Sequence, residues 1–181
     1  MMGHMIRPAD IYVLLGVAAR DEGAFTYREL ANELGIPHAQ VQRSLDRAGA
    51  SGLYHSDRHG VHRANLEEFL IHALRYVAPA SLGAVVAGVP AAWAAEPLSA
   101  RIASDDELPP VWPSAVGEVR GRALEPLHPA AVDAARTNRH LARLLSIADA
   151  LRVGDARIRR EAKDILPGEL RRAVTFGNGD R

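Results

Sequence analysis

The segment from Thr26 to Ala50 contains two helix starts separated by one helix stop, and this pattern constrains the fold more than any other part of the chain. Thr26 and Glu29 have the spacing of a capping box, in which a hydroxyl and a carboxylate each bind a backbone N–H at a helix start. Gly35 favours the left-handed conformation that ends a helix, and Pro37 suits the first turn of the next one. The pattern predicts one helix that ends at Gly35 and a second from Pro37 to about Ala50.

Short-range signals on both sides of this helical pair define its neighbours. Pro8 and Asp10 suit the start of a helix, and the spacing of the apolar residues after them predicts a helix over residues 8–20. Residues 53–56 and 61–63 are predicted to form two short strands around a turn that contains Gly60. The first part of the chain is therefore expected to fold as three helices followed by a small hairpin.

The next segments change from a helical to an irregular pattern. Asn65 is expected to cap an amphipathic helix that ends at Pro79. From Pro79 to Pro129 the chain holds eight prolines and four glycines, so we expect neither long helices nor central strands there. Only residues 116–120 are expected to form a strand, at the edge of a sheet.

Helical patterns return in the last third of the chain. A helix is expected over residues 131–136, and a leucine stripe over residues 141–151 predicts another that stops at Gly154. An arginine-rich helix is expected from about residue 155 to 166, before Pro167. We expect the leucine stripe to pack against the first helix or against a second subunit.

The composition of the 181-residue chain favours a mainly α fold. Aromatic residues make up 5%, whereas alanine, leucine, valine and arginine dominate, which is typical of helices packed through small side chains. The pattern divides the chain into residues 6–77, with the hairpin, a Pro/Gly-rich irregular region over 78–130, and C-terminal helices over 131–176.

The order of helix, capped helix, glycine turn, helix and hairpin is that of a winged helix-turn-helix domain. Residues 28–47, RELANELGIPHAQVQRSLDR, and the closing segment 50–53 resemble the DNA-binding segment of MarR-like bacterial regulators. The resemblance covers about 60 residues, from Ile11 to about Leu70. It implies that residues 6–77 form a winged-helix domain that binds double-stranded DNA and that the protein is a homodimeric transcriptional regulator, most simply a repressor.

The predicted helix from Pro37 to Ala50 has two chemically different faces. Val41, Leu45 and Ala48 lie close together at 100° per residue, so they are expected to face the core. The opposite face then carries side chains that bind base edges or phosphates in a major groove, and Arg43 is the best candidate for a base contact. These side chains are Gln40, Arg43, Asp46 and Arg47, with Gln42 at the flank.

Further contacts are expected from the neighbouring elements. Thr26 and Arg28 would meet phosphates at the start of the preceding helix, and Arg58 and His59 would lead the hairpin towards the minor groove or the backbone. The complete set of predicted DNA contacts is Thr26, Arg28, His38, Gln40, Gln42, Arg43, Arg47, Arg58, His59 and Arg63.

The charge balance argues against a strongly basic DNA-binding protein. The chain has 22 basic and 22 acidic residues, although segment 37–63 has four arginines against two aspartates. The alternative is an antitoxin-like or other interaction module that holds a partner protein, with DNA binding autoregulatory or absent. On that alternative the neutral N-terminal module and the Pro-rich, acidic middle of the chain hold the partner.

The chain has no cysteine, so disulfides, thiolate metal sites and cysteine nucleophiles are excluded. His55, His59 and His62 lie in a strand, turn and strand and are not expected to converge on a metal. The acidic run 105–107 is interpreted as a solvated loop. Without a phosphate-binding glycine loop or paired carboxylates, we expect neither an enzyme nor a cofactor.

Two open points concern effectors and location. Trp93, Trp112 and Tyr76, with segment 82–95, either line a pocket for a small-molecule effector or simply pack in the core. The longest apolar stretch, 78–95, is interrupted by prolines and glycines, so we do not expect it to span a membrane. We expect a cytoplasmic location instead.

Overall fold

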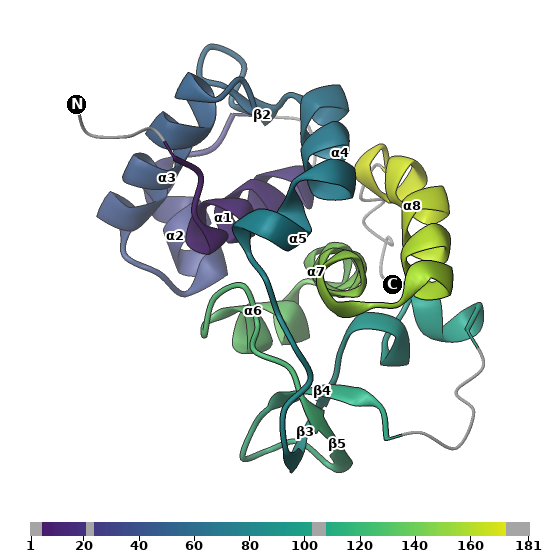
Figure 1. Cartoon of the computed structure of the whole chain (residues 1–181). Helices are drawn as coiled ribbons and strands as arrows, with labels where there is room; N and C mark the ends of the chain where they lie inside the picture. Colours follow the sequence, from purple (N-terminus) through teal and green to yellow (C-terminus); the bar gives the residue numbers. More distant parts are fainter. Residues whose placement is uncertain (1–4, 21–23, 103–107, 173–181) are drawn as a thin grey trace, which may run out of the picture.

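The computed structural model describes residues 5–20, 24–102 and 108–172 of the chain, and their architecture is mainly helical (Figure 1). A two-stranded hairpin and a separate group of three strands complete it. The helices are α1 Pro8–Ala18, α2 Tyr27–Leu34, α3 His38–Ala50, α4 Arg63–His72, α5 Leu74–Val77, α6 Ala131–Thr137, α7 Arg139–Val153 and α8 Ala156–Leu170. The strands are β1 Tyr54–His55, β2 Gly60–Val61, β3 Val85–Pro90, β4 Pro110–Pro113 and β5 Val119–Ala123, and short 3₁₀ turns cover Ala92–Ala94 and Leu98–Ala100.

Two helices, α1 and α7, lie in the interior of the molecule. Every residue of α1 from Asp10 to Ala18 is buried, and so is every residue of α7 from Leu144 to Leu151. Helices that are buried all round in this way must be covered by other elements on every side. The elements that cover α7 are α1, α4, α5, α6, α8 and the 3₁₀ turn Ala92–Ala94, and the contact with α1 confirms the expected packing of the leucine stripe against the first helix. A second subunit is not needed to bury that stripe.

The expected helical pair and hairpin are confirmed. Thr26 and Glu29 form the capping box of α2, and Gly35 ends α2 with a φ of 64°. Pro37 is the residue before α3 rather than the first residue of its helical turn. In the hairpin β1 pairs antiparallel with β2, and the left-handed residue of the turn is His59, with a φ of 48°, rather than Gly60.

The expected cap at Asn65 is wrong. The helix begins two residues earlier, at Arg63, and the Asn65 side chain donates a hydrogen bond to the Gly52 carbonyl at 2.8 Å. The helix also does not continue unbroken to Pro79, because it is interrupted at Ala73 between α4 and α5.

The region from 78 to 130 is more regular than expected. β3 pairs antiparallel with both β4 and β5, and β4 and β5 pair parallel, so the three strands close into a small ring. The expected strand at 116–120 is displaced to Val119–Ala123, and β3 and β4 were not expected. This ring, which we call the lobe, lies at the opposite end of the molecule from α3 and the hairpin (Figure 1).

A buried polar contact joins the lobe to α7. The Trp112 indole nitrogen, on β4, donates to the Asp149 carboxylate at 2.7 Å. Arg152 donates to the same carboxylate at 2.6 Å and also to the Ala78 carbonyl at 2.8 Å. Burial raises the pKa of Asp149, and the hydrogen bonds from Arg152 and Trp112 oppose that effect.

The last helix is longer than expected. It continues through Pro167 to Leu170 instead of stopping at residue 166. Leu166 and Leu170 are one turn apart and both buried, so the final turn is held against the core despite the proline.

One hydrophobic core extends from Ile6 to Leu170 and takes buried residues from all three expected regions of the chain. Among the residues that the model describes, the helices are all too short or too polar to traverse a lipid bilayer.

Candidate functional site

Helix α3 presents one face to the core and one to solvent. Val41, Leu45 and Ala48 are buried at 0 to 1% exposure, as expected from their spacing. The exposed side of the helix carries the polar side chains of His38, Gln42, Arg43 and Asp46. Arg43 forms no ion pair with any described residue, so its guanidinium group is available to a ligand.

Arg47 does not lie on that open face, which corrects the expectation. Its Nε donates to Asp10 Oδ2 at 2.8 Å, and the Asp10 side chain is fully buried in α1. The hydrogen bond that Arg47 donates to the Asp10 carboxylate raises the pKa of Arg47. A buried carboxylate needs a charged partner, so Arg47 fixes α3 on α1 rather than reaching outward.

Gln40 is also occupied within the chain. Its amide nitrogen lies 3.2 Å from His128 Nε2, on the segment before α6. His128 Nδ1 accepts from the Ala130 N–H at 3.1 Å, and the His128 ring stacks on Tyr12 with 5.2 Å between ring centroids. Burial lowers the pKa of His128, so the neutral ring is favoured. Gln40 therefore ties α3 to the second half of the chain.

The start of α2 keeps the arrangement that the sequence predicts. The Thr26 hydroxyl accepts from the Glu29 N–H at 3.1 Å, and Glu29 accepts from the Thr26 N–H at 2.7 Å. The latter hydrogen bond lowers the pKa of Glu29. Thr26 and Arg28 are exposed, and Arg28 is not engaged by another described side chain.

The predicted DNA-contact residues of the hairpin do not all face solvent. Arg58 lies at the tip with its side chain 80% exposed, 3.9 Å from Asp57. His59 instead turns inward and packs edge-on against Phe25, with 5.5 Å between ring centroids, which corrects its expected place beside Arg58 at the tip. Arg63 is half-buried below the hairpin, at the first position of α4.

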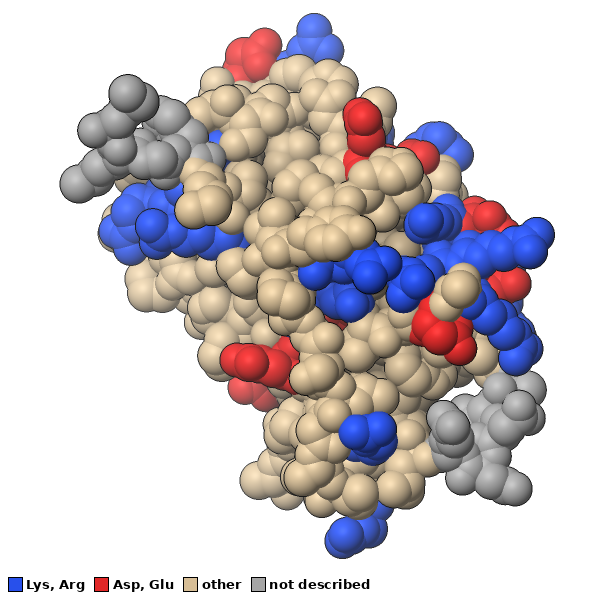
Figure 2. Space-filling view, viewed as in Figure 1, with Lys and Arg blue, Asp and Glu red and all other residues tan. Residues whose placement is uncertain are grey.

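The outward-facing predicted residues are thus Thr26, Arg28, His38, Gln42, Arg43 and Arg58, whereas Gln40, Arg47, His59 and Arg63 lie against the protein. Arg28, Arg43 and Arg58 place one exposed guanidinium group on each of three consecutive elements: α2, α3 and the hairpin. In Figure 2, Lys and Arg side chains gather at the left edge beside α3 and at the right beside α8, while the lower lobe is mostly uncharged.

The aromatic residues do not converge on one effector pocket. Trp112 is 2% exposed and belongs to the core, Trp93 is half-buried against it, and Tyr76 is 72% exposed. A small pocket of about 230 Å³ does border Trp112, together with Val89 and Arg143. The interpretation of Trp112 as a packed core residue therefore fits the structure.

The acidic run 105–107, interpreted above as a solvated loop, lies outside the described residues.

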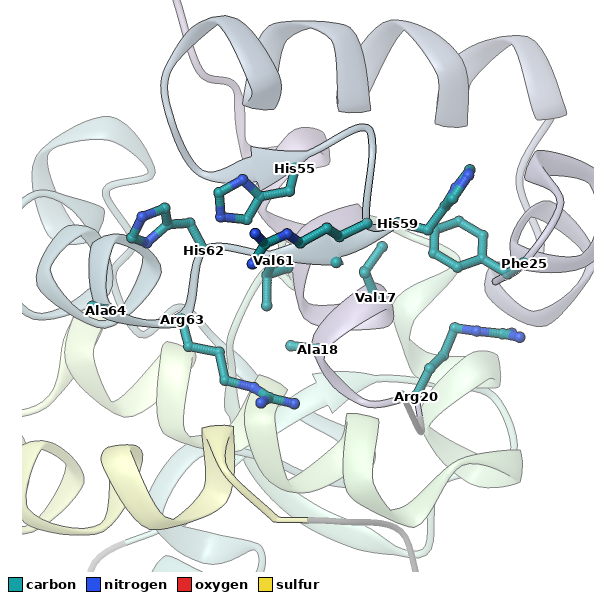
Figure 3. A pocket seen from close by; sticks show the side chains of 12 residues that line it. Val17, Ala18, Arg20, Phe25, His55, His59, Val61, His62, Arg63 and Ala64 are labelled. Carbon is teal, nitrogen blue, oxygen red and sulfur yellow. The ribbon is translucent and has the colours of Figure 1, made fainter. Parts of the chain in front are cut away.

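Sequence reasoning missed a pocket of about 540 Å³ beneath the hairpin (Figure 3). It lies between the end of α1, the hairpin and the start of α4, so its walls come from three separate parts of the sequence. His55 and His62 stack on one side, with 4.8 Å between ring centroids. The described residues contain no group of three or more histidines and carboxylates placed to hold a metal ion.

Comparison of the chain with protein-family models, curated proteins and solved structures found no match.

Proposed function

We propose that this protein is a winged-helix DNA-binding regulator that contacts double-stranded DNA through α3 and the β1–β2 hairpin. The observation that carries the proposal is the exposed face of α3, where Gln42 and Arg43 lie opposite a fully buried apolar face. Arginine binds guanine and glutamine binds adenine through two hydrogen bonds each, so these are side chains suited to base recognition.

The surrounding geometry supports the same function. α2 and α3 form a helix pair joined at Gly35, and the hairpin follows α3 directly, as the resemblance to MarR-like regulators implies. Arg47 and Gln40 orient α3 against α1 and His128, which would preorganise the helix for binding. Arg28 and Arg58 supply charge for phosphate contacts on either side. We further propose that the protein binds as a homodimer, because one winged helix contacts few base pairs.

The test is a selection of duplexes from a random library, followed by titration of the enriched sequence and of the DNA upstream of the protein's own gene. Arg43→Ala should weaken binding of the enriched duplex by roughly 5- to 150-fold, the equivalent of about 1–3 kcal/mol. Arg58→Ala should weaken binding to all sequences alike and reduce the slope of log affinity against log salt by about 1.

The matched control is Arg160→Ala. Arg160 is exposed on α8 and forms no ion pair with the described residues, and α8 lies on the other side of the molecule from α3 (Figure 1). Its substitution should leave affinity unchanged. Failure to enrich any sequence, or equal effects of the Arg43 and Arg160 substitutions, would exclude the proposed interface.

A second candidate function is the binding of a partner protein, as in an antitoxin-like module, and the lobe favours it. Val85 and Val116 are 43% and 64% exposed there. A pocket of about 440 Å³ with a largely apolar lining, including Pro113 and Pro126, opens at the lobe. Exposed apolar surface of this kind is typical of interaction sites. The test is stoichiometric co-purification with a partner encoded nearby, which Val116→Asp should abolish.

A further inference from the structure

His128 joins two parts of the protein that are far apart in the sequence. It lies in the segment before α6, whereas its partner Gln40 is on α3, 88 residues earlier along the chain. Its ring also stacks on Tyr12 of α1, with 7° between the two ring planes. The ring therefore lies where the C-terminal half of the chain meets α1 and α3.

The hydrogen bonds of the His128 ring fix its protonation state. Nδ1 accepts from the N–H of Ala130, the residue before α6, at 3.1 Å, so Nδ1 itself carries no proton. The proton of the neutral ring is then on Nε2 and points at Gln40. A half-turn of the Gln40 amide brings its oxygen to the position that accepts this proton. Only the neutral ring fits this arrangement.

A second proton on His128 would break the arrangement. An imidazolium ring has two N–H donors and no acceptor, so it would place an N–H against the Ala130 N–H. Burial acts in the same direction and lowers the pKa of His128. Stacking on Tyr12 favours a cation, but it supplies no acceptor. Protonation is therefore expected to move the ring out of its place, which also breaks the contact with Gln40.

The groups that face the ring do not offset the effect of burial. α1 presents Tyr12, whose hydroxyl donates to the Leu34 carbonyl of α2 at 2.8 Å, and α3 presents the neutral Gln40 amide. α6 carries Asp133, whose charge adds to burial in raising the pKa of Tyr12. The lowered pKa of His128 is caused by burial, with no opposing contribution from Asp133.

The segment around His128 supports the two elements that lead to the exposed face of α3. α3 packs mainly on α1, α2 and β1, and Gln40 adds a contact to the second half of the chain. Ala130 lies beside Gly35, at the turn between α2 and α3, where a Cβ on Gly35 would be 3.7 Å from that of Ala130. Figure 1 shows α6 next to α2 on this side of the molecule. A shift of residues 128–130 would therefore loosen α3 and the turn before it.

We propose that His128 is a pH-sensitive latch on α3: the neutral ring holds Gln40 and the start of α6 together, and protonation releases both. The stability that the latch contributes is complete above the pKa of histidine in the unfolded chain, about 6.5. It is lost as the pH falls from there through the lower pKa of the folded state. The release is a property of the chain alone, and only its effect on DNA affinity rests on the proposed function.

The experiment follows the histidine rings and the backbone amides of the full chain by NMR, without DNA, from about pH 8 to about pH 5. The His128 ring should titrate at a lower pH than the ring of His72, which is exposed at the end of α4. The amides of Gln40 and Ala130 should shift with the same midpoint as the His128 ring, because the protonated ring leaves both residues.

The matched variants are His128→Asn and His72→Asn. An asparagine oxygen can accept the Ala130 N–H as Nδ1 does, but the side chain does not titrate, so His128→Asn keeps the cap and removes its pH dependence. Between about pH 7.5 and about pH 5.5, the urea midpoint of the unmodified chain should fall by more than that of His128→Asn. His72→Asn should show the same fall as the unmodified chain.

The amide spectrum of each variant shows whether it is folded, and Gln40→Ala provides a second test if His128→Asn is not. In Gln40→Ala the His128 ring should still titrate, but the amides of residues 41 and 42 should no longer follow it, because the side chain that links them to the ring is gone.

Three results would overturn the latch. The first is a His128 midpoint equal to or above that of His72. The second is a Gln40 amide that does not follow the His128 ring. The third is an equal fall in urea midpoint for the unmodified chain and for a folded His128→Asn variant.

The effect on DNA is measured separately, with the duplex enriched in the selection described above. From about pH 7.5 to about pH 5.5, the affinity of the unmodified chain should fall relative to that of His128→Asn, since all other histidines are common to both proteins. An equal change in both would overturn the latch as a regulator of DNA binding. Binding by neither protein at either pH would instead contradict the proposed regulator function, and the NMR titration would still report on the latch.

Discussion

The start of α2 and the lobe of β3, β4 and β5 are stabilised by contacts of different range along the sequence. The start of α2 is fixed by Thr26 and Glu29, which are three residues apart. In the lobe, Val85 pairs with Arg122, and Trp112 binds Asp149, 37 residues further along the chain. α2 can therefore start on local contacts, whereas the lobe forms only when segments far apart in the sequence have come together.

The largest effect is expected where the lobe meets α7. Asp149→Ala removes the acceptor of Trp112 and leaves the Arg152 guanidinium buried without its carboxylate. We expect a loss of about 3–5 kcal/mol in the free energy of unfolding, measured by urea denaturation. Asp164→Ala, at an exposed position of α8, should stay within about 0.5 kcal/mol. A loss below about 1 kcal/mol for Asp149→Ala would mean that the lobe does not depend on this contact.

An intermediate effect is expected inside the lobe itself. A side chain at Gly88 would overlap the backbone carbonyl of Trp112, because β3 and β4 approach closely there. Gly88→Ala should cost about 1–3 kcal/mol through overpacking, with a change in the near-ultraviolet signal of tryptophan.

The control for that substitution is Gly168→Ala. An added Cβ at Gly168, in α8, meets no atom within 4 Å, so the substitution should be neutral or stabilise the protein by up to about 1 kcal/mol. Similar losses for both glycines would contradict the close approach of the strands.

The smallest effect is expected at the start of α2. Thr26→Ala removes the hydroxyl that caps α2 and should cost about 1 kcal/mol of unfolding free energy in thermal or urea melts. Ser56→Ala, at an exposed position of the hairpin turn, serves as the comparison and should change stability by less than about 0.5 kcal/mol. Equal losses of stability for the two substitutions would mean that the Thr26 cap does not stabilise α2.

The same contrast explains what could be predicted from the sequence. The capping box and Gly35 are short-range signals, so α2, α3 and the hairpin follow from them directly. The sequence pattern does not predict the strands β3 and β4, because proline is generally excluded from central strands. Pro90, Pro110 and Pro113 instead lie at strand ends, where proline is tolerated.

In the candidate site, too, short-range sequence patterns predict local positions of side chains but not their distant partners. Periodicity correctly places Arg43 on the outer face of α3, and Val41 on the inner one. It gives no information about Asp10 or His128, which hold Arg47 and Gln40 and lie far from them in the sequence. The pocket beneath the hairpin was missed for the same reason, since its lining comes from separate segments.

The position of α7 determines how this protein can be dissected. Because α7 covers α1 and α4 and is anchored to the lobe through Asp149, an excised piece ending at residue 77 would expose to water the side of α1 that α7 normally shields. Such a fragment would be prone to aggregate, and a test of the proposed DNA binding made on it would not report on the intact chain. Binding and ligand studies therefore need the polypeptide at least through Leu170, the last core residue in the part of the chain that the structure describes.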